Sequence, residues 1–473
     1  MRQTFRSSIV ACLWIALVFH ANDAAHAQLP SIAVRRTKAD FEGHSGIQIV
    51  RRPDRPFIER RYGQQLINFD LLIQNSGTKK YDLVSIKLQV FDSGGRLELE
   101  RELNENGRPP ALDMIGERVL PPGKVLDVFQ PFYAFDSAVD VSRMHLELLF
   151  MEQGHAAPPA AITADELVSV DVRPRSFDPT AFSLPLHGLI LVHDGHDFYS
   201  HHRRYNLVSR YEADPGSAVS ANLYAYDFMT TTSEGLLFKG DPNRKESWLS
   251  YGEPIFAPAD GLVIEVVSDL PENSFTSTGE AHSPPIEEAK DPMGFGNHVK
   301  IQHADGRVSW LLHMQPNSIR VMVGDHVRAG QFIGKVGFSG DSLFPHLHYN
   351  VTDGPNYPSQ GVPSYFKQFV RVLGERRISM SKGQIDTGDM VVDGDGLIRA
   401  CSHYLGGWRC ERESGQAILG TQGRVRELWR AHRRGRERSM ARFAPQPAGT
   451  GPVFPMSASL LASVTGYSAL VTP

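Results

Sequence analysis

The chain has 473 residues, of which 41% are hydrophobic and 22% are charged, a balance typical of globular proteins with two or three domains. The formal net charge of −4 argues against a dedicated nucleic-acid binder, because such proteins normally carry a strongly basic domain. Only 3 cysteines are present, too few for a fold held together mainly by disulfides.

The first residues have the pattern of a secretory signal peptide, which we place at residues 1–27. Arg2 and Arg6 supply the positive start, Ile9–Phe19 the apolar core and Ala25–Ala27 a small-residue cleavage site. An uncleaved anchor is the alternative, but the apolar core is short for a stable bilayer span, and no later stretch predicts a transmembrane helix. We therefore expect an exported protein, periplasmic or secreted, with no transmembrane segment in its mature chain.

Residues 28–178 are expected to form an Ig-like β-sandwich. Apolar side chains recur at every second position, which is typical of strands with one buried face, and turn signals such as Asn75-Ser76-Gly77 separate the runs. This region shows no cluster of catalytic residue types. The proline-containing stretch Arg173–Leu186 is expected to be a linker. One clear alternating run consists of Ile67, Phe69, Leu71 and Ile73.

Residues 186–393 are rich in glycine, in short β runs and in histidine. The sequence Phe344-Pro345-His346-Leu347-His348 is the most informative stretch, because side chains two residues apart on a strand share one face. Two adjacent imidazoles can bind a metal, or one can bind it while the other handles a proton.

Residues 394–473 differ in character. Arg424–Arg442 reads as a basic helix, either simply solvated or binding an anionic surface, and the remainder of the segment is expected to be poorly ordered. Cys401 and Cys410 form an even pair that could close a small loop in an oxidising compartment, because Cys12 leaves with the signal peptide.

Several segments of the second region occur together in a characteristic order. Gly252–Gly261 precedes a strand, Gly296–His303 leads into a hairpin that ends at His313, and the glycine-rich run Val323–Gly334 leads to the His-x-His pair. In this order the region resembles the M23 family of zinc metallopeptidases, of the lysostaphin/LytM type. The resemblance implies an antiparallel β peptidase domain.

The resemblance also implies roles for individual residues. Asp227, in Tyr-Ala-Tyr-Asp-Phe, and His348 match two zinc ligands of the family. His313 and His346 match the two histidines that do not bind the metal and would orient or deprotonate the attacking water. Zinc held by three protein ligands keeps a fourth position open for that water and lowers its pKa.

One position departs from the family pattern. The first ligand usually lies four residues before the aspartate, where this chain has Leu223, which cannot bind zinc. An upstream histidine must then supply the third ligand, with His202 preferred, His201 second and His196 third. The metal ligands are thus expected to be His202, Asp227 and His348, and the catalytic histidines His313 and His346.

The expected function is that of an exported zinc-dependent endopeptidase that cleaves peptide cross-links of bacterial peptidoglycan by means of zinc-bound water. The substrate class follows from the resemblance alone. Because of Leu223, a catalytically inactive LytM-fold regulator or cell-wall-binding protein is the alternative. A scaffolding role of the sandwich and the arginine-rich segment is a further one. The partner in either enzyme or regulator is a cell-wall peptide and not a nucleic acid.

Overall fold

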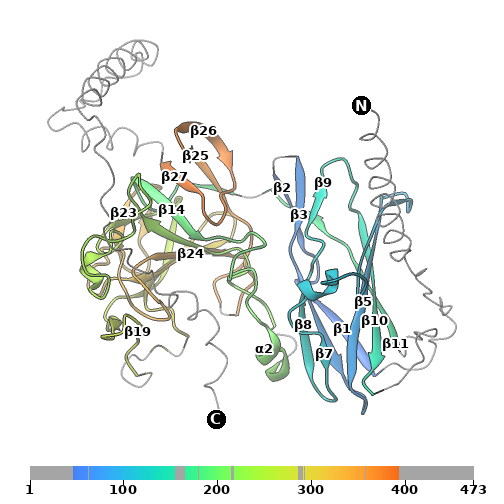
Figure 1. Ribbon diagram of the computed structural model, residues 1–473. Coiled ribbons are helices and arrows are strands. Elements are labelled where there is room, and N and C mark those ends of the chain that lie inside the picture. The colour runs from blue at the N-terminus through green and yellow to red at the C-terminus, as the bar shows by residue number, and fades with distance from the viewer. Residues whose placement is uncertain are drawn as a thin grey trace, which may run out of the picture. The chain divides into compact units, whose positions relative to one another are not determined.

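The computed structural model describes residues 46–393 except 62, 155–165, 179, 215–217, 286–290, 292 and 357. The predicted signal peptide, the cysteine pair Cys401 and Cys410, and the basic stretch Arg424–Arg442 lie outside the described residues. Within them, strands dominate and the only helices are short, so the predicted mainly β class is confirmed (Figure 1). No helix in this part of the chain is long and apolar enough to cross a membrane.

The first region is built from sheets with alternating burial. β5 is the longest strand here, and from Val84 onwards its buried and half-buried residues alternate because successive side chains point to opposite faces. Its elements are β1 (Ile47–Arg52), β2 (Phe57–Arg61), β3 (Gln64–Ile67), β4 (Asp70–Asn75), β5 (Tyr81–Phe91), β6 (Leu97–Asn104), the 3-10 helix η3 (Ala111–Met114), β7 (Val119–Leu120), β8 (Val125–Phe129), β9 (Ala134–Asp136), β10 (Arg143–Glu152) and β11 (Glu166–Val172).

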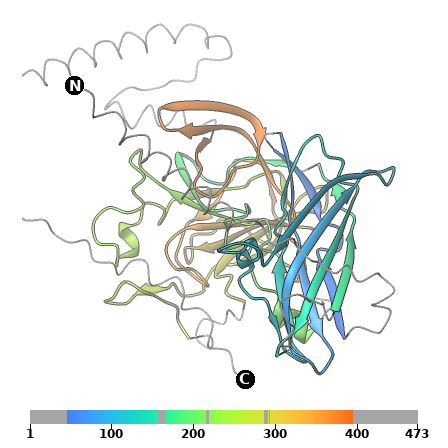
Figure 2. The same cartoon turned by 45° about the vertical axis from the view of Figure 1, so that its right-hand side comes forward.

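Two of these sheets share one hydrophobic core. The sheet of order β1-β4-β8 contributes residues such as Leu71 and Val128, and the sheet of order β11-β10-β5-β6 contributes residues such as Leu88 and Leu146. Figure 2 shows the blue and teal strands of this region side by side in layers. The paired sheets agree with a sandwich, while its Ig-like topology and the limits 28–178 remain predictions.

The second region is organised around one large sheet of order β13-β25-β27-β14-β15-β24-β21-β20-β17-β22, with β26 paired to β25. Its elements are β12 (Arg175–Ser176), β13 (Ala181–Phe182), β14 (Leu189–Asp194), α2 (Val208–Ala213), β15 (Tyr226–Thr230), the 3-10 helix η5 (Lys245–Ser247), β16 (Pro254–Phe256), β17 (Gly261–Val267), β18 (Ser274–Phe275), β19 (Ala281–His282), β20 (Asn297–Gln302), β21 (Val308–Met314), β22 (His326–Val327), β23 (Phe332–Lys335), β24 (Leu347–Thr352), β25 (Tyr365–Leu373), β26 (Arg376–Gly383) and β27 (Met390–Asp393).

The expected linker Arg173–Leu186 is not a free connection. β12 pairs in parallel with β2, β13 pairs in parallel with β25, and Leu184 and Leu186 are buried in the core of the second region. Pro174 and Pro185 permit this because they lie outside the paired residues. The linker prediction was therefore wrong for the described residues. The limits 186–393 of the peptidase domain remain a prediction.

The segment between β14 and β15 packs on the β1-β4-β8 sheet. Leu207 and Tyr211 bury their side chains against Leu72 of β4. The backbone N–H of Leu207 donates to Asp127 Oδ2 of β8 at 2.8 Å. Burial raises the pKa of Asp127 to about 7, with a further contribution from the nearby charge of Asp70.

This raised pKa predicts a pH-dependent stability. The folded protein retains a proton on Asp127 that the unfolded chain releases near the ordinary value, so the group opposes folding increasingly as pH rises towards 7. Asp127→Asn keeps an acceptor for Leu207. We expect its free energy of unfolding, relative to wild type, to rise by on the order of 1–2 kcal/mol between about pH 5 and about pH 8.5. Urea unfolding at both values measures this, and an equal difference at both would contradict it.

Candidate metal centre

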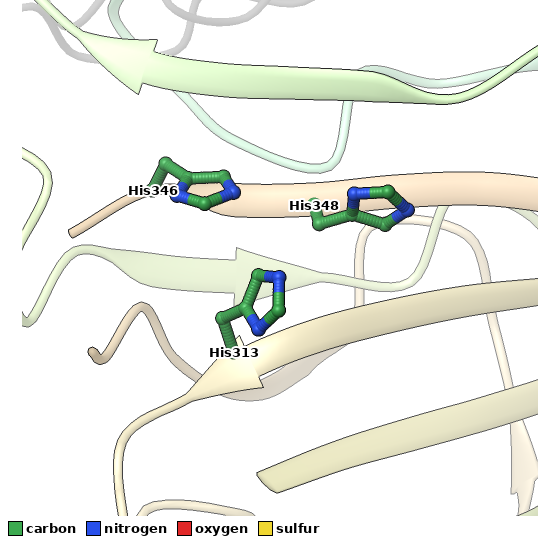
Figure 3. Close-up of side chains that lie close together, drawn as sticks. All are labelled: His313, His346 and His348. Carbon is green, nitrogen blue, oxygen red and sulfur yellow. The ribbon is translucent and has the colours of Figure 1, made fainter. Parts of the chain in front are cut away.

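Strand register brings Asp227 and His348 together. The two residues are direct neighbours across β15 and β24. Leu347 and Tyr349, on either side of His348, are fully buried in the core, so alternation along the strand sends His346 and His348 to the other face. Figure 3 shows the two imidazoles along one strand. The sequence prediction of a shared face is therefore confirmed.

His313 also lies beside His346 and His348, but an irregular backbone conformation brings it there. It lies at the end of β21, one residue after Leu312, which is the direct neighbour of His348. Strict alternation would send His313 to the opposite face, but its φ of 60° turns the backbone into the left-handed region, which is uncommon for a residue other than glycine. Its ring centre lies 4.9 Å from that of His346 and 5.7 Å from that of His348 (Figure 3).

A β-bulge places Asp194 beside the histidines. In the pairing of β14 with β15, Val192 lies opposite Phe228, and the register then shifts so that Asp194 lies opposite Asp227. Without the bulge Asp194 would follow Val192 into the core. With it, a second carboxylate joins the face that carries Asp227.

Four imidazoles surround the carboxylate of Asp227, which is 5% exposed. Oδ1 lies 3.1 Å from His348 Nδ1, 3.2 Å from His346 Nε2 and 3.5 Å from His202 Nε2. Oδ2 lies 4.0 Å from His201 Nε2. The histidines come from the loop after β14 and from the start of β24, so distant parts of the sequence converge on one carboxylate.

Burial and charge act on these groups in opposite directions. Burial alone would raise the pKa of Asp227, but the charges of His346 and His202, with the hydrogen bonds from His346 and His348, hold it well below its ordinary value. Burial lowers the pKa of His348 to about 4 and the pKa of His313 well below its ordinary value. At neutral pH the Asp227 carboxylate is therefore charged, and the His313 and His348 imidazoles are neutral.

Asp194 distinguishes His202 from His201. Its Oδ2 lies 2.8 Å from Nδ1 of His202 and 2.9 Å from Nδ1 of His201. The His202 side chain is 4% exposed and its ring centre lies 4.9 Å from that of His348, whereas the His201 side chain is 68% exposed. The geometry thus favours His202 over His201 as the residue that completes the site.

Other sequence expectations can be placed as well. Leu223 is 1% exposed and packs in the core, so the usual ligand position is occupied by a core residue. His196, the third ligand choice, is buried against Glu59 at 3.0 Å and lies away from the cluster. His326 is exposed, as expected. Sequence reasoning missed Asp194, although the run Val-His-Asp-Gly-His-Asp offered a carboxylate a few residues before the expected ligand histidine.

The donor atoms fit a zinc ion. Two groups of residues, all buried except the exposed His201, have candidate ligand atoms within 4.8 Å of one another: His313 with His346 and His348, and Asp194 with His201, His202 and Asp227. Two imidazoles and one carboxylate make a donor set that catalytic zinc sites use. Asp194 Oδ2 lies 2.8 Å from Nδ1 of His202, the place from which carboxylates commonly orient a ligand histidine in metal sites. Nε2 of His348 is buried without a hydrogen-bond partner among the described residues.

Comparison with known proteins agrees with this geometry. Residues 248–359 match the model of Peptidase family M23. This part of the chain is an M23 peptidase segment. The segment contains His313, His346 and His348, but it begins after His202 and Asp227. The assignment of those two residues therefore depends on the geometry described above.

Curated relatives align over short stretches of this chain. The glycyl-glycine endopeptidase ALE-1 of Staphylococcus capitis is 30% identical over 103 residues, 22% of this chain and 22% of the relative. The DD-carboxypeptidase/endopeptidase Mpg of Neisseria gonorrhoeae is 41% identical over 58 residues, 12% of this chain and 13% of the relative. The chain thus spans less than a quarter of the length of these relatives.

A similar solved structure is the mutant catalytic domain of the prophage-encoded M23 protein EnpA from Enterococcus faecalis. It is 27% identical, covers 29% of this chain and 73% of that chain, and has a TM-score of 0.19. A score this low does not establish a common fold over the whole chain.

Proposed function

We propose that this protein is an exported, zinc-dependent endopeptidase that acts on peptide cross-links of bacterial peptidoglycan. The observation that carries the proposal is the convergence of His202 Nε2 and His348 Nδ1 on Asp227 Oδ1, at 3.5 Å and 3.1 Å, in a buried site. The M23 match supports the reaction class. The substrate class is supported by the names of similar proteins, among them the peptidoglycan DD-endopeptidase ShyC of Vibrio cholerae.

In this proposal His202, Asp227 and His348 hold the zinc. When bound, zinc supplies a Lewis acid that polarises a carbonyl and lowers the pKa of water. Asp194 Oδ2 lies 2.8 Å from Nδ1 of His202, which would leave Nε2 to present its lone pair to the metal. Asp227 contributes a negative charge, which together with two neutral imidazoles leaves the loaded centre net positive and suited to an oxyanion.

His313 and His346 would handle protons beside the metal. Nδ1 of His313 donates to Ser339 O at 2.8 Å, and Nδ1 of His346 donates to Phe344 O at 2.8 Å. Nε2 of His346 lies 3.2 Å from Asp227 Oδ1, and although burial opposes it, the charge of Asp227 raises the pKa of His346. The Ser339 carbonyl fixes the tautomer of His313 in which Nε2 is a free acceptor. Such an imidazole can accept a proton from the attacking water and return it to the leaving amine.

A regulator that binds the wall without cleaving it is the second candidate. Leu223 favours it, because this buried leucine replaces the ligand that the family usually has. Stoichiometric zinc together with cleavage of purified peptidoglycan supports the enzyme. Metal-free protein that binds peptidoglycan without cleaving it supports the regulator.

The ligand assignment predicts a ranking of zinc affinities. We expect His202→Ala and His348→Ala to lose bound zinc, because each removes one of three donors. His201→Ala should retain most of it, because the exposed His201 ring lies farther from Asp227. Zinc content after dialysis against buffered free zinc measures this. A stronger loss in His201→Ala than in His202→Ala would reverse the assignment.

The catalytic assignment predicts a separation of binding from turnover. His346→Ala should retain zinc but lose hydrolysis of purified peptidoglycan by about 100-fold or more, because it removes a proton-transfer group and not a ligand. His326→Ala, an exposed histidine on β22, is the matched control and should behave as wild type. Full activity of His346→Ala would contradict its role.

A further inference from the structure

Arg203 follows the proposed ligand His202 in the sequence. Its guanidinium group is hydrogen-bonded to three residues of the N-terminal region. The side chain is 1% exposed. Nε donates to Asn68 Oδ1 at 3.0 Å, one terminal nitrogen donates to Asp70 Oδ1 at 2.7 Å, and the other donates to Phe69 O at 3.0 Å. A planar guanidinium bonded on three sides has one orientation, so these contacts fix the backbone from which His202 projects.

A buried polar network extends this anchor. Glu59 of β2 is 1% exposed and accepts from Asn68 Nδ2 at 3.1 Å. Its other oxygen lies 3.0 Å from His196 Nε2 and also accepts from Gln384. Buried charges persist in proteins when they are paired and hydrogen-bonded, as here. The loop after β14 is thus fixed to β2 through His196 and to the start of β4 through Arg203.

Apolar contacts flank the anchor on both sides. Phe198 stacks on Tyr133, with ring centres 4.3 Å apart and an interplanar angle of 12°. Leu207 and Tyr211 pack on Leu72. The stretch from Phe198 to Tyr211 is therefore held by the N-terminal sheets before, at and after the position of His202.

His202 itself contacts the second region, through Asp194 of β14. Asp194 of β14 accepts from the backbone N–H of His202 at 3.1 Å and lies 2.8 Å from its Nδ1. Ser200 Oγ donates to the same Asp194 oxygen at 2.8 Å and lies 3.3 Å from the N–H of Arg203. Consecutive residues thus face opposite ways, His202 towards the metal centre and Arg203 towards β4.

We propose that the N-terminal region is a built-in positioning element of the metal centre, in which Asn68, Phe69 and Asp70 hold Arg203 and thereby place His202 as a ligand. Arg203 is a positioning residue, since it contacts none of the reacting groups. The inference rests on the proposed function. The inference gives the N-terminal sheets a role in assembling the metal centre.

The test uses the full-length protein and measures metal affinity instead of activity alone. Arg203→Lys keeps a positive charge for Asp70 but lacks the fork that reaches Asn68 and Phe69 O. We expect its zinc affinity, from competition with a chromophoric chelator, to fall by about 10–100-fold. We also expect the visible spectrum of its cobalt(II) form to change, because one imidazole no longer coordinates.

A second variant distinguishes the loss of His202 positioning from a general loss of folding. Arg203→Met combined with Asp70→Leu removes the buried charge pair completely, a replacement that proteins often tolerate. It should fold yet show the same weakened affinity. Leu88→Ala is the control, because Leu88 is fully buried in the N-terminal core and takes no part in the Arg203 network. It should lower thermal stability while leaving zinc affinity at 25 °C unchanged.

The outcomes separate the inference from the proposed function. Wild-type zinc affinity and cobalt spectra in both Arg203 variants would overturn the positioning role and leave the endopeptidase proposal intact. An equal loss of affinity in folded Leu88→Ala would also overturn it, since the effect would then be general destabilisation. Failure of the wild-type protein itself to bind zinc would remove the proposed function first.

Discussion

The candidate site depends on one buried carboxylate. Asp227 lies between core residues on β15, where an isolated charge would be strongly unfavourable. The imidazoles of His202, His346 and His348 offset the cost of burying this charge, because each places a ring nitrogen within 3.5 Å of Asp227 Oδ1. Because the carboxylate must be paired, the loop after β14 and the start of β24 have to meet there, and the geometry of the candidate site follows from that meeting.

Two local irregularities complete the arrangement that regular strands begin. Alternation alone would direct Asp194 and His313 into the core or to the opposite face. The register shift in β14 and the left-handed backbone of His313 turn both towards Asp227. Irregular backbone of this kind is common where a strand must re-aim a functional side chain. Here it adds a carboxylate beside His202 and an imidazole beside His346 and His348.

Part of this could be predicted from the sequence. The spacing of His346 and His348 fixed their common face, and apolar neighbours placed Asp227 on a strand. The choice of His202 came from a family resemblance and a missing ligand at Leu223, and not from any pattern in the loop itself. The position of Asp194 could not be predicted, because the pattern of apolar residues in β14 does not reveal the bulge. The partners of Arg203 could not be predicted either. Contacts from Arg203 back to Asp70 span 133 residues and depend on how the sheets pack.

The most direct measurement is anomalous diffraction at the zinc edge from crystals of the full-length protein grown with zinc. The account predicts one strong peak about 2.0–2.2 Å from His202 Nε2, from an Asp227 oxygen and from a His348 nitrogen. A peak enclosed by His313, His346 and His348 with His202 outside its coordination sphere would contradict it, as would crystals without a peak at Asp227.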